Sequence, residues 1–148
     1  MRKLVRDAMT ADPRTIAIHE SVAKAARLMA EENVGSIPVV DYDLILAGIV
    51  TDRDITVRVV AECRDPELTR VDEIATKHVS PAYPDEPLDD ALAQMARHRV
   101  RRLPVIDNDR VVGILAQADV VHEVKDKKAG QLLDEVSQPE VPSLGRAG

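Results

Sequence analysis

The residues best suited to bind a ligand are Thr51-Asp52-Arg53-Asp54, which directly follow an apolar run at residues 45–50. The run predicts a buried strand, and the polar residues after it predict the start of a helix. Main-chain N–H groups and the helix dipole favour an anion at such a start. The carboxylate of Asp54 can accept hydrogen bonds from two vicinal hydroxyls, as on a ribose. The hydroxyl of Thr51 and the guanidinium of Arg53 can contact phosphate.

A second interpretation of the same residues needs no ligand. Thr51 and Asp54 are spaced as the N-cap and N3 residues of a capping box, in which each side chain accepts from the main-chain N–H of the other residue. Further along the chain the acid recurs as Asp119, but Ala116 stands in the place of Thr51 and has no hydroxyl. A reciprocal box cannot form there, and from the residues alone both interpretations stay open.

The other side chains that do chemistry in enzymes are scattered along the chain. The histidines at 19, 78, 98 and 122 show no spacing typical of metal ligands, and Cys63 has no CxxC partner. The 6 glycines form no phosphate-binding loop. We therefore expect no enzyme activity, no catalytic residues and no metal site.

The candidate residues belong to a repeat that spans most of the chain. V-G-S-I-P-V-V-D with G-I-V-T-D-R-D-I, within 34–55, is matched by V-R-R-L-P-V-I-D with G-I-L-A-Q-A-D-V, within 100–120. Each copy predicts a short helix, an extended segment with proline, an amphipathic helix, a β-hairpin and a closing helix. Such a period indicates two similar subdomains, which are small and should share a core.

The paired motifs resemble the CBS (cystathionine-β-synthase) domain family, in the tandem arrangement called a Bateman module, over about four fifths of the chain. We therefore expect an α/β (α+β) fold of two subdomains related by a pseudo-twofold axis, each a short sheet with flanking helices. The sequence divides into subdomains at 1–64 and 65–126. An extension at 127–148 contains proline and glycine and is expected to be partly disordered.

The resemblance also implies which residues bind a ligand. In this family the aspartate at the position of Asp54 commonly holds an adenosine ribose, and the hydroxyl three residues earlier commonly assists. The apolar residue before the proline and residues near the first strand line the base pocket. The implied residues are Asp54, Thr51, Ile37 and Ile16 in the first copy, and Asp119, Leu103 and Ala82 in the second. Because Ala116 departs from the pattern, we expect one dominant nucleotide, at Thr51 and Asp54.

One basic cluster stands out, Arg97-His98-Arg99-Val100-Arg101-Arg102. Cations at this place can complement the C-terminal end of a helix dipole. Alternatively, Arg101 or Arg102 faces the cleft between the repeats, where the planar guanidinium can bind a phosphate through two hydrogen bonds. Both readings of the cluster stay open.

Composition argues against several other classes of protein. The net charge of −6 and the absence of Phe and Trp do not favour a nucleic-acid-binding surface. The single Cys63 excludes an intrachain disulfide and fits a cytoplasmic protein. No apolar stretch approaches the length of a membrane span, and the basic N-terminus is not followed by the apolar run of a signal peptide.

These observations lead to one functional hypothesis and one alternative. We expect a regulatory module, with no attached enzyme, channel or DNA-binding domain, that binds an adenosyl ligand in the cleft between the repeats and signals to a partner. The ligand would be AMP, ADP, ATP or S-adenosylmethionine, no cofactor is required, and the resemblance implies a homodimer. The alternative is a structural or protein-interaction module without a nucleotide ligand.

Local patterns predict how individual elements begin, end and pack. The helix after Ser21 should end with Gly35 in the left-handed conformation. Thr69 and Asp72 have the spacing of an N-cap and an N3 residue. Both strands of the first hairpin are nearly continuous in apolar residues, which predicts burial on both faces. The first amphipathic helix should bury Val22, Ala25, Ala26, Met29 and Ala30.

Overall fold

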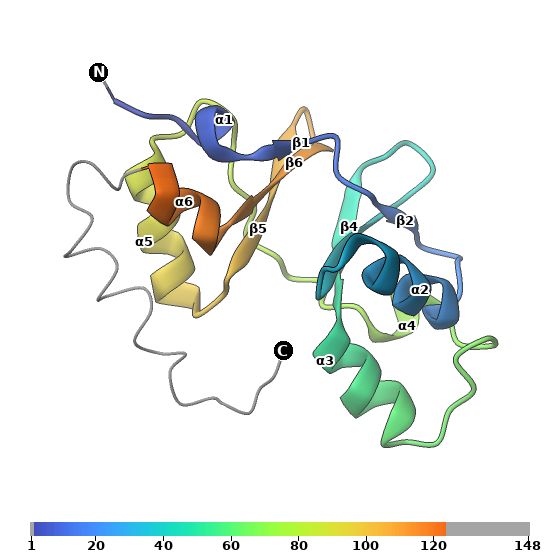
Figure 1. Ribbon diagram of the computed structural model, residues 1–148. Coiled ribbons are helices and arrows are strands. Elements are labelled where there is room, and N and C mark those ends of the chain that lie inside the picture. Colours follow the sequence, from blue (N-terminus) through green and yellow to red (C-terminus); the bar gives the residue numbers. More distant parts are fainter. Residues whose placement is uncertain (1, 124–148) are drawn as a thin grey trace. The chain divides into compact units, whose positions relative to one another are not determined.

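The computed structural model describes residues 2–123, and these form two compact units (Figure 1). The first-repeat unit consists of residues 12–80 with 108–111. The second-repeat unit consists of residues 2–11, 81–107 and 112–123. The predicted extension at 127–148 lies outside the described residues.

The first-repeat unit contains a three-stranded mixed sheet in the order β2-β3-β4. Strand β2 runs parallel to β3, which forms an antiparallel hairpin with β4. Its elements are β2 (Ile16–Ala17), α2 (Val22–Glu32), β3 (Ser36–Val40), β4 (Leu46–Thr51), α3 (Asp52–Ile55), the π-helical turn η1 (Thr56–Val60) and α4 (Val71–Ile74). This arrangement confirms the predicted hairpin and the helix that follows it.

The second-repeat unit contains a three-stranded sheet in the order β1-β6-β5. Its elements are α1 (Val5–Ala8), β1 (Thr10–Ala11), α5 (Leu88–His98), β5 (Arg102–Asp107), β6 (Arg110–Ala116) and α6 (Gln117–Glu123). Strand β1 pairs antiparallel with β6. The mixed α/β architecture, with two small sheets and flanking helices, agrees with the fold class expected from the sequence.

The repeats exchange their first helices between the two cores. Val5 of α1 is fully buried among Leu88, Leu103 and other apolar residues of the second-repeat unit. Val71 of α4 is fully buried in the core of the first-repeat unit. The predicted division into 1–64 and 65–126 follows the sequence repeat, whereas each compact unit takes segments from both copies.

The backbone pairing repeats between the two copies, as the internal period predicts. In each unit the second strand of the hairpin pairs antiparallel with the segment that follows the exchanged helix, and a short extended segment pairs parallel with the first strand of the hairpin. The antiparallel pairs are Thr10 with Ile114 and Thr76 with Ile49, and the parallel pairs are Ile16 with Val39 and Ala82 with Val105.

Glycine is required where the exchanged segment crosses the hairpin. A Cβ atom on Gly48 would lie 2.6 Å from the main-chain oxygen of Thr76. On Gly113 it would lie 2.6 Å from the sulfur of Met9 and 3.1 Å from the main-chain oxygen of Thr10. Gly48 therefore allows two backbones to approach more closely than a Cβ atom permits, whereas at Gly113 the backbone contact is only tight and the Met9 side chain could move.

Helix α2 differs from its prediction in its buried face and in its end. It buries Val22, Ala23, Ala25, Leu28 and Met29, whereas Ala26 and Ala30 are exposed. The buried face of the helix therefore includes Ala23 and Leu28 in place of the predicted Ala26 and Ala30. Asn33, not Gly35, takes the left-handed conformation at φ 56° and ends the helix, because an asparagine tolerates that region.

Strand burial also departs in part from the sequence pattern. Four of the five residues of β3 are buried, as predicted, but β4 alternates between buried and half-exposed positions, so the prediction of burial on both faces fails there. Thr69 is not a helix cap, because α4 begins after Arg70. Its hydroxyl instead donates to the main-chain oxygen of Asp65 at 2.8 Å.

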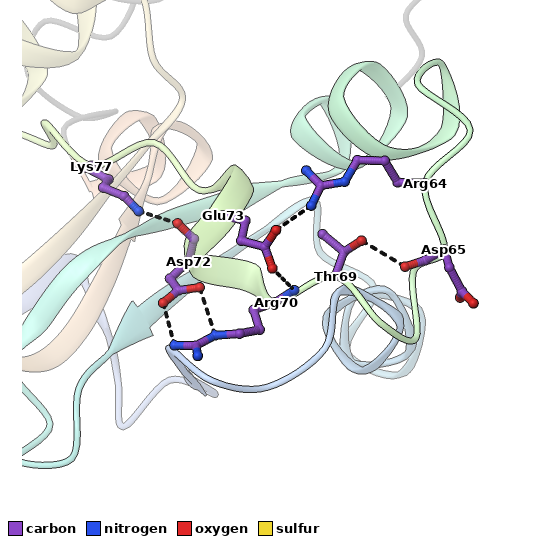
Figure 2. Close-up of polar contacts among 7 residues, drawn as sticks. All are labelled: Arg64, Asp65, Thr69, Arg70, Asp72, Glu73 and Lys77. Atoms are coloured by element: carbon purple, nitrogen blue, oxygen red, sulfur yellow. Dashed lines mark hydrogen bonds and ion pairs between the residues drawn. The ribbon is translucent and has the colours of Figure 1, made fainter.

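A network of hydrogen bonds and ion pairs links residues 64–70, which connect η1 to α4, with α4 itself (Figure 2). Arg64 forms an ion pair with Glu73, whose second oxygen accepts from the main-chain N–H of Arg70 at 2.9 Å. The guanidinium of Arg70 binds both oxygens of Asp72, at 3.1 and 2.7 Å. The N–H of Arg70 and, second, the Arg64 guanidinium lower the pKa of Glu73. Acid should therefore weaken this attachment.

Candidate ligand-binding site

The candidate site lies where β4 passes into α3. Thr51 has extended backbone angles and Asp52 begins the helix, so the polar side chains follow directly on strand β4. The main-chain N–H of Thr51 donates to Asp54 Oδ2 at 2.9 Å, and the N–H of Asp54 donates to Thr51 Oγ1 at 3.0 Å. The capping box that the spacing predicted is therefore formed.

The carboxylate of Asp54 is held in place but still reaches solvent. Its side chain is 11% exposed, and Oδ1 lies 3.9 Å from Nε of Arg58, one helical turn further on. A carboxylate offers about four acceptor positions on its two oxygens, and the box uses one of them. Sequence reasoning did not consider Arg58, although its spacing of four residues from Asp54 would have been a usable signal.

A further polar group, missed in the sequence, lies beside this pair. Ser36 is the antiparallel partner of Thr51 across the hairpin, which places both side chains on the same face of the sheet. Its Oγ is buried and has no hydrogen-bond partner among the described residues. Next to it, a Cβ atom on Gly35 would lie 2.9 Å from Oδ2 of Asp52, so glycine leaves room for that carboxylate.

The other residues expected in the first copy differ in their exposure. Arg53 is exposed on α3, where its guanidinium is accessible. Ile37 and Ile16 are 1% and 2% exposed and belong to the core. Their apolar character is thus explained by packing, and a role in lining a base pocket stays a prediction.

The second-repeat unit repeats the backbone of this site with different side chains. The N–H of Gln117 donates to the main-chain oxygen of Arg101 at 2.7 Å, as that of Asp52 donates to Gly35 at 2.9 Å. Arg101 is exposed and Arg102 is half-buried, beside the start of α6.

The remaining residues expected in the second copy divide in the same way as those in the first. Asp119 in the first turn of α6 and Ala116 before it are half-buried. Leu103 and Ala82 are core residues, 2% and 0% exposed. Their proposed part in a base pocket is likewise untested by this geometry.

The described part of the chain offers neither a metal-binding cluster nor a membrane-spanning helix. Within residues 2–123, no group of three or more His, Cys, Asp or Glu side chains is placed to hold a metal ion. None of the helices in that range is long and apolar enough to cross a membrane.

The matches to known proteins fall on the two copies of the repeat. The CBS domain model matches residues 5–61 and 71–126. The CBS domain-containing protein YhcV of Bacillus subtilis is 38% identical over 138 residues, which are 93% of this chain and 97% of that protein.

Three of the similar solved structures contain bound metal ions or ligands. The crystal structure of Hypoxic Response Protein I with two coordinated zinc ions has a TM-score of 0.76 and 33% identity, over 81% of this chain and 98% of that one. The CBS domain pair of MJ0100, in complex with 5′-methylthioadenosine and S-adenosyl-L-methionine, has a TM-score of 0.72 and 30% identity, over 86% and 100%. CBSX2 in complex with AMP has a TM-score of 0.72 and 26% identity, over 84% and 98%.

The matched residues cover both copies of the repeat, including each hairpin and the helix that follows it. The relative YhcV is aligned over nearly its whole length. On this evidence the chain belongs to the CBS domain family, as a tandem pair of CBS domains.

Proposed function

We propose that the chain is a regulatory module that binds an adenosyl ligand at Thr51 and Asp54 and signals its binding to a partner protein. The ligand class is AMP, ADP, ATP or S-adenosylmethionine. The observation that carries the proposal is the Asp54 carboxylate, which is fixed by a main-chain N–H yet 11% exposed. The family members bound to AMP, or to 5′-methylthioadenosine and S-adenosyl-L-methionine, support the same ligand class.

The site suits a ribose for a physical reason. Two vicinal hydroxyls can both donate to one carboxylate, and Asp54 has acceptor positions left after the capping box is formed. Because the box already holds the carboxylate, little conformational entropy is lost when the ligand binds. Arg53 is the proposed phosphate contact in this unit, since it is exposed and only one residue from Asp54.

We propose one dominant nucleotide per chain, because the two copies differ in one hydroxyl. Thr51 can offer a hydrogen bond that Ala116 cannot, and a hydrogen bond to a charged group contributes roughly 1.5–3 kcal/mol. That difference corresponds to about one to two decades in affinity. Arg101 and Arg102 are also proposed as phosphate-binding residues.

Ligand binding is tested by thermal unfolding and calorimetric titration of the wild-type chain with AMP, ADP, ATP and S-adenosylmethionine. A ligand at 100 times its dissociation constant should stabilise the fold by about 2.7 kcal/mol. For a chain of this size that raises the thermal midpoint by roughly 5–10 °C. GMP serves as the control for recognition of the base. No shift and no heat with any of the four compounds would contradict the proposal.

One observation favours the alternative of a protein-interaction module without a nucleotide. The capping box is complete in the chain alone, so Thr51 and Asp54 already have a structural role. The same titration separates the two functions, because an interaction module would show no response to any adenosyl compound. No catalytic role is proposed for any residue.

We also propose a homodimer and a cytoplasmic location, which the family resemblance and the single Cys63 suggest. Val57 and Val60 on η1 are 43% and 65% exposed, and Leu68 is 80% exposed, which leaves apolar surface for association. Light scattering at several protein concentrations measures the mass. A monomer at every concentration would contradict the dimer.

A further inference from the structure

The hydroxyl of Ser36 is not explained by the fold. Its Oγ is buried without a hydrogen-bond partner among the described residues. Buried polar groups in native proteins are nearly always paired, and each exception calls for an explanation. A bound molecule that reaches this hydroxyl could supply the missing partner.

The strand register shows which face of the sheet this hydroxyl occupies. Ser36 and Thr51 are directly opposite in the hairpin, and Ile37 and Val50 form the next pair. Side chains alternate along a strand, so the two pairs point to opposite faces. Ile37 and Val50 belong to the core, at 1% and 0% exposed. Ser36 therefore lies beside the side chain of Thr51, on the face away from that core.

The neighbouring polar groups of Thr51 and Asp54 hydrogen-bond to each other and not to Ser36. Oγ1 of Thr51 accepts from the N–H of Asp54, and the N–H of Thr51 donates to Asp54. The capping box thus joins Thr51 and Asp54 only to each other. The hydroxyl of Ser36 lies next to this pair and takes no part in the box.

The second copy shows that the fold does not require a serine here. The residue at the same place in β5 is Arg102, which is half-buried. One strand position thus accommodates either a short hydroxyl or a long cation.

We propose that Ser36 is a specificity-determining residue, whose hydroxyl forms a hydrogen bond with a polar group of the nucleoside bound at Thr51 and Asp54. This inference rests on the proposed function and assigns to the same site a group that the family motif did not. It makes the site a set of three side chains, Ser36, Thr51 and Asp54, contributed by both strands of the hairpin and by α3.

The test compares Ser36→Ala with Ser21→Ala, two removals of one hydroxyl with opposite expected results. Ser36→Ala should leave the thermal midpoint of the ligand-free protein unchanged or raise it, because an unpaired buried hydroxyl is removed. Titration with AMP and with adenosine should show binding weakened by about twofold to tenfold, the loss of one hydrogen bond. Ser21 caps α2, where its Oγ accepts from Lys24 N at 3.1 Å. Its replacement should lower the midpoint and leave the affinity unchanged.

The outcomes distinguish this inference from the proposed function. If the wild type binds none of AMP, ADP, ATP, S-adenosylmethionine and adenosine, both are overturned. If the wild type binds and Ser36→Ala binds equally well, only the role of Ser36 is overturned. A midpoint lowered by Ser36→Ala to the extent seen with Ser21→Ala would show that the hydroxyl has a structural partner, which also overturns the inference.

Discussion

Replacing Asp54 by Asn should separate its capping role from its ligand-binding role. The capping hydrogen bond runs from the Thr51 N–H to Oδ2 at 2.9 Å, and an asparagine oxygen can accept it equally well. The pair with Arg58 is 3.9 Å long and its guanidinium is 56% exposed, so its loss should matter little. We expect Asp54→Asn to lower the free energy of unfolding by well under about 1 kcal/mol, the typical value of a cap.

The effect of the same change on binding should be large. The asparagine NH₂ donates hydrogen bonds, so the side chain cannot accept from two vicinal hydroxyls as the carboxylate can. Losing a hydrogen bond to a charged group costs roughly 1.5–3 kcal/mol, which is about one to two decades in affinity. Asp54→Ala should lose the affinity and, in addition, about 0.5–2 kcal/mol of cap stability.

The assay is calorimetric titration with AMP, combined with thermal unfolding of wild type, Asp54→Asn, Asp54→Ala and Thr51→Ala. One kcal/mol lowers the midpoint of a chain of this size by roughly 2–4 °C. Thr51→Ala is the control for the box, since it removes the acceptor of the Asp54 N–H and keeps the carboxylate. If Asp54→Ala and Thr51→Ala lower the midpoint alike and AMP affinity is unchanged in all variants, the pair is only a helix cap.

Three further predictions concern the repeat, its attachment and its asymmetry. Gly48→Ala should cost about 1–3 kcal/mol in denaturant unfolding, because its Cβ would lie 2.6 Å from the Thr76 oxygen, and an unchanged midpoint would contradict the close crossing. Because the pKa of Glu73 is lowered, its stabilising contribution is full above its ordinary pKa of 4.5 and is lost as pH falls through the lowered value. Glu73→Gln should flatten the dependence of stability on acid pH, and an identical pH profile would refute the link. Ala116→Thr should strengthen nucleotide binding in the second copy by completing the hydroxyl and carboxylate pair with Asp119, and a titration without any gain would show that the hydroxyl is not the missing group.

Local interactions explain why part of the site could be predicted from the sequence. Thr51 and Asp54 are three residues apart at the end of an apolar run, and their hydrogen bonds depend only on that spacing and on the helix start. The hairpin was predictable for the same reason, since its two apolar runs are joined by a short polar interval. The recurrence of both patterns indicated the family and the fold class, which the comparison with known proteins and the two small sheets then confirmed.

Long-range packing explains what the sequence did not show. No local pattern indicates that Val5 is buried in the core of the second-repeat unit or that Val71 is buried in that of the first. The left-handed end of α2 was misplaced because glycine is the usual residue there, whereas Asn33 takes the position. Ser36 was missed because its significance comes from its strand partner and from the lack of any hydrogen bond, and neither is visible in sequence spacing.

The capping and ligand-binding interpretations of Thr51 and Asp54 are compatible, because they use different atoms and directions. The box uses Oδ2 of Asp54 and uses Oγ1 of Thr51 only as an acceptor, so the hydroxyl can still donate its proton. Oδ1 faces Arg58 only at 3.9 Å, which is too long for a hydrogen bond that would occupy it. Because the capping bonds fix both side chains before a ligand arrives, a helix start that is stable in the free protein favours binding.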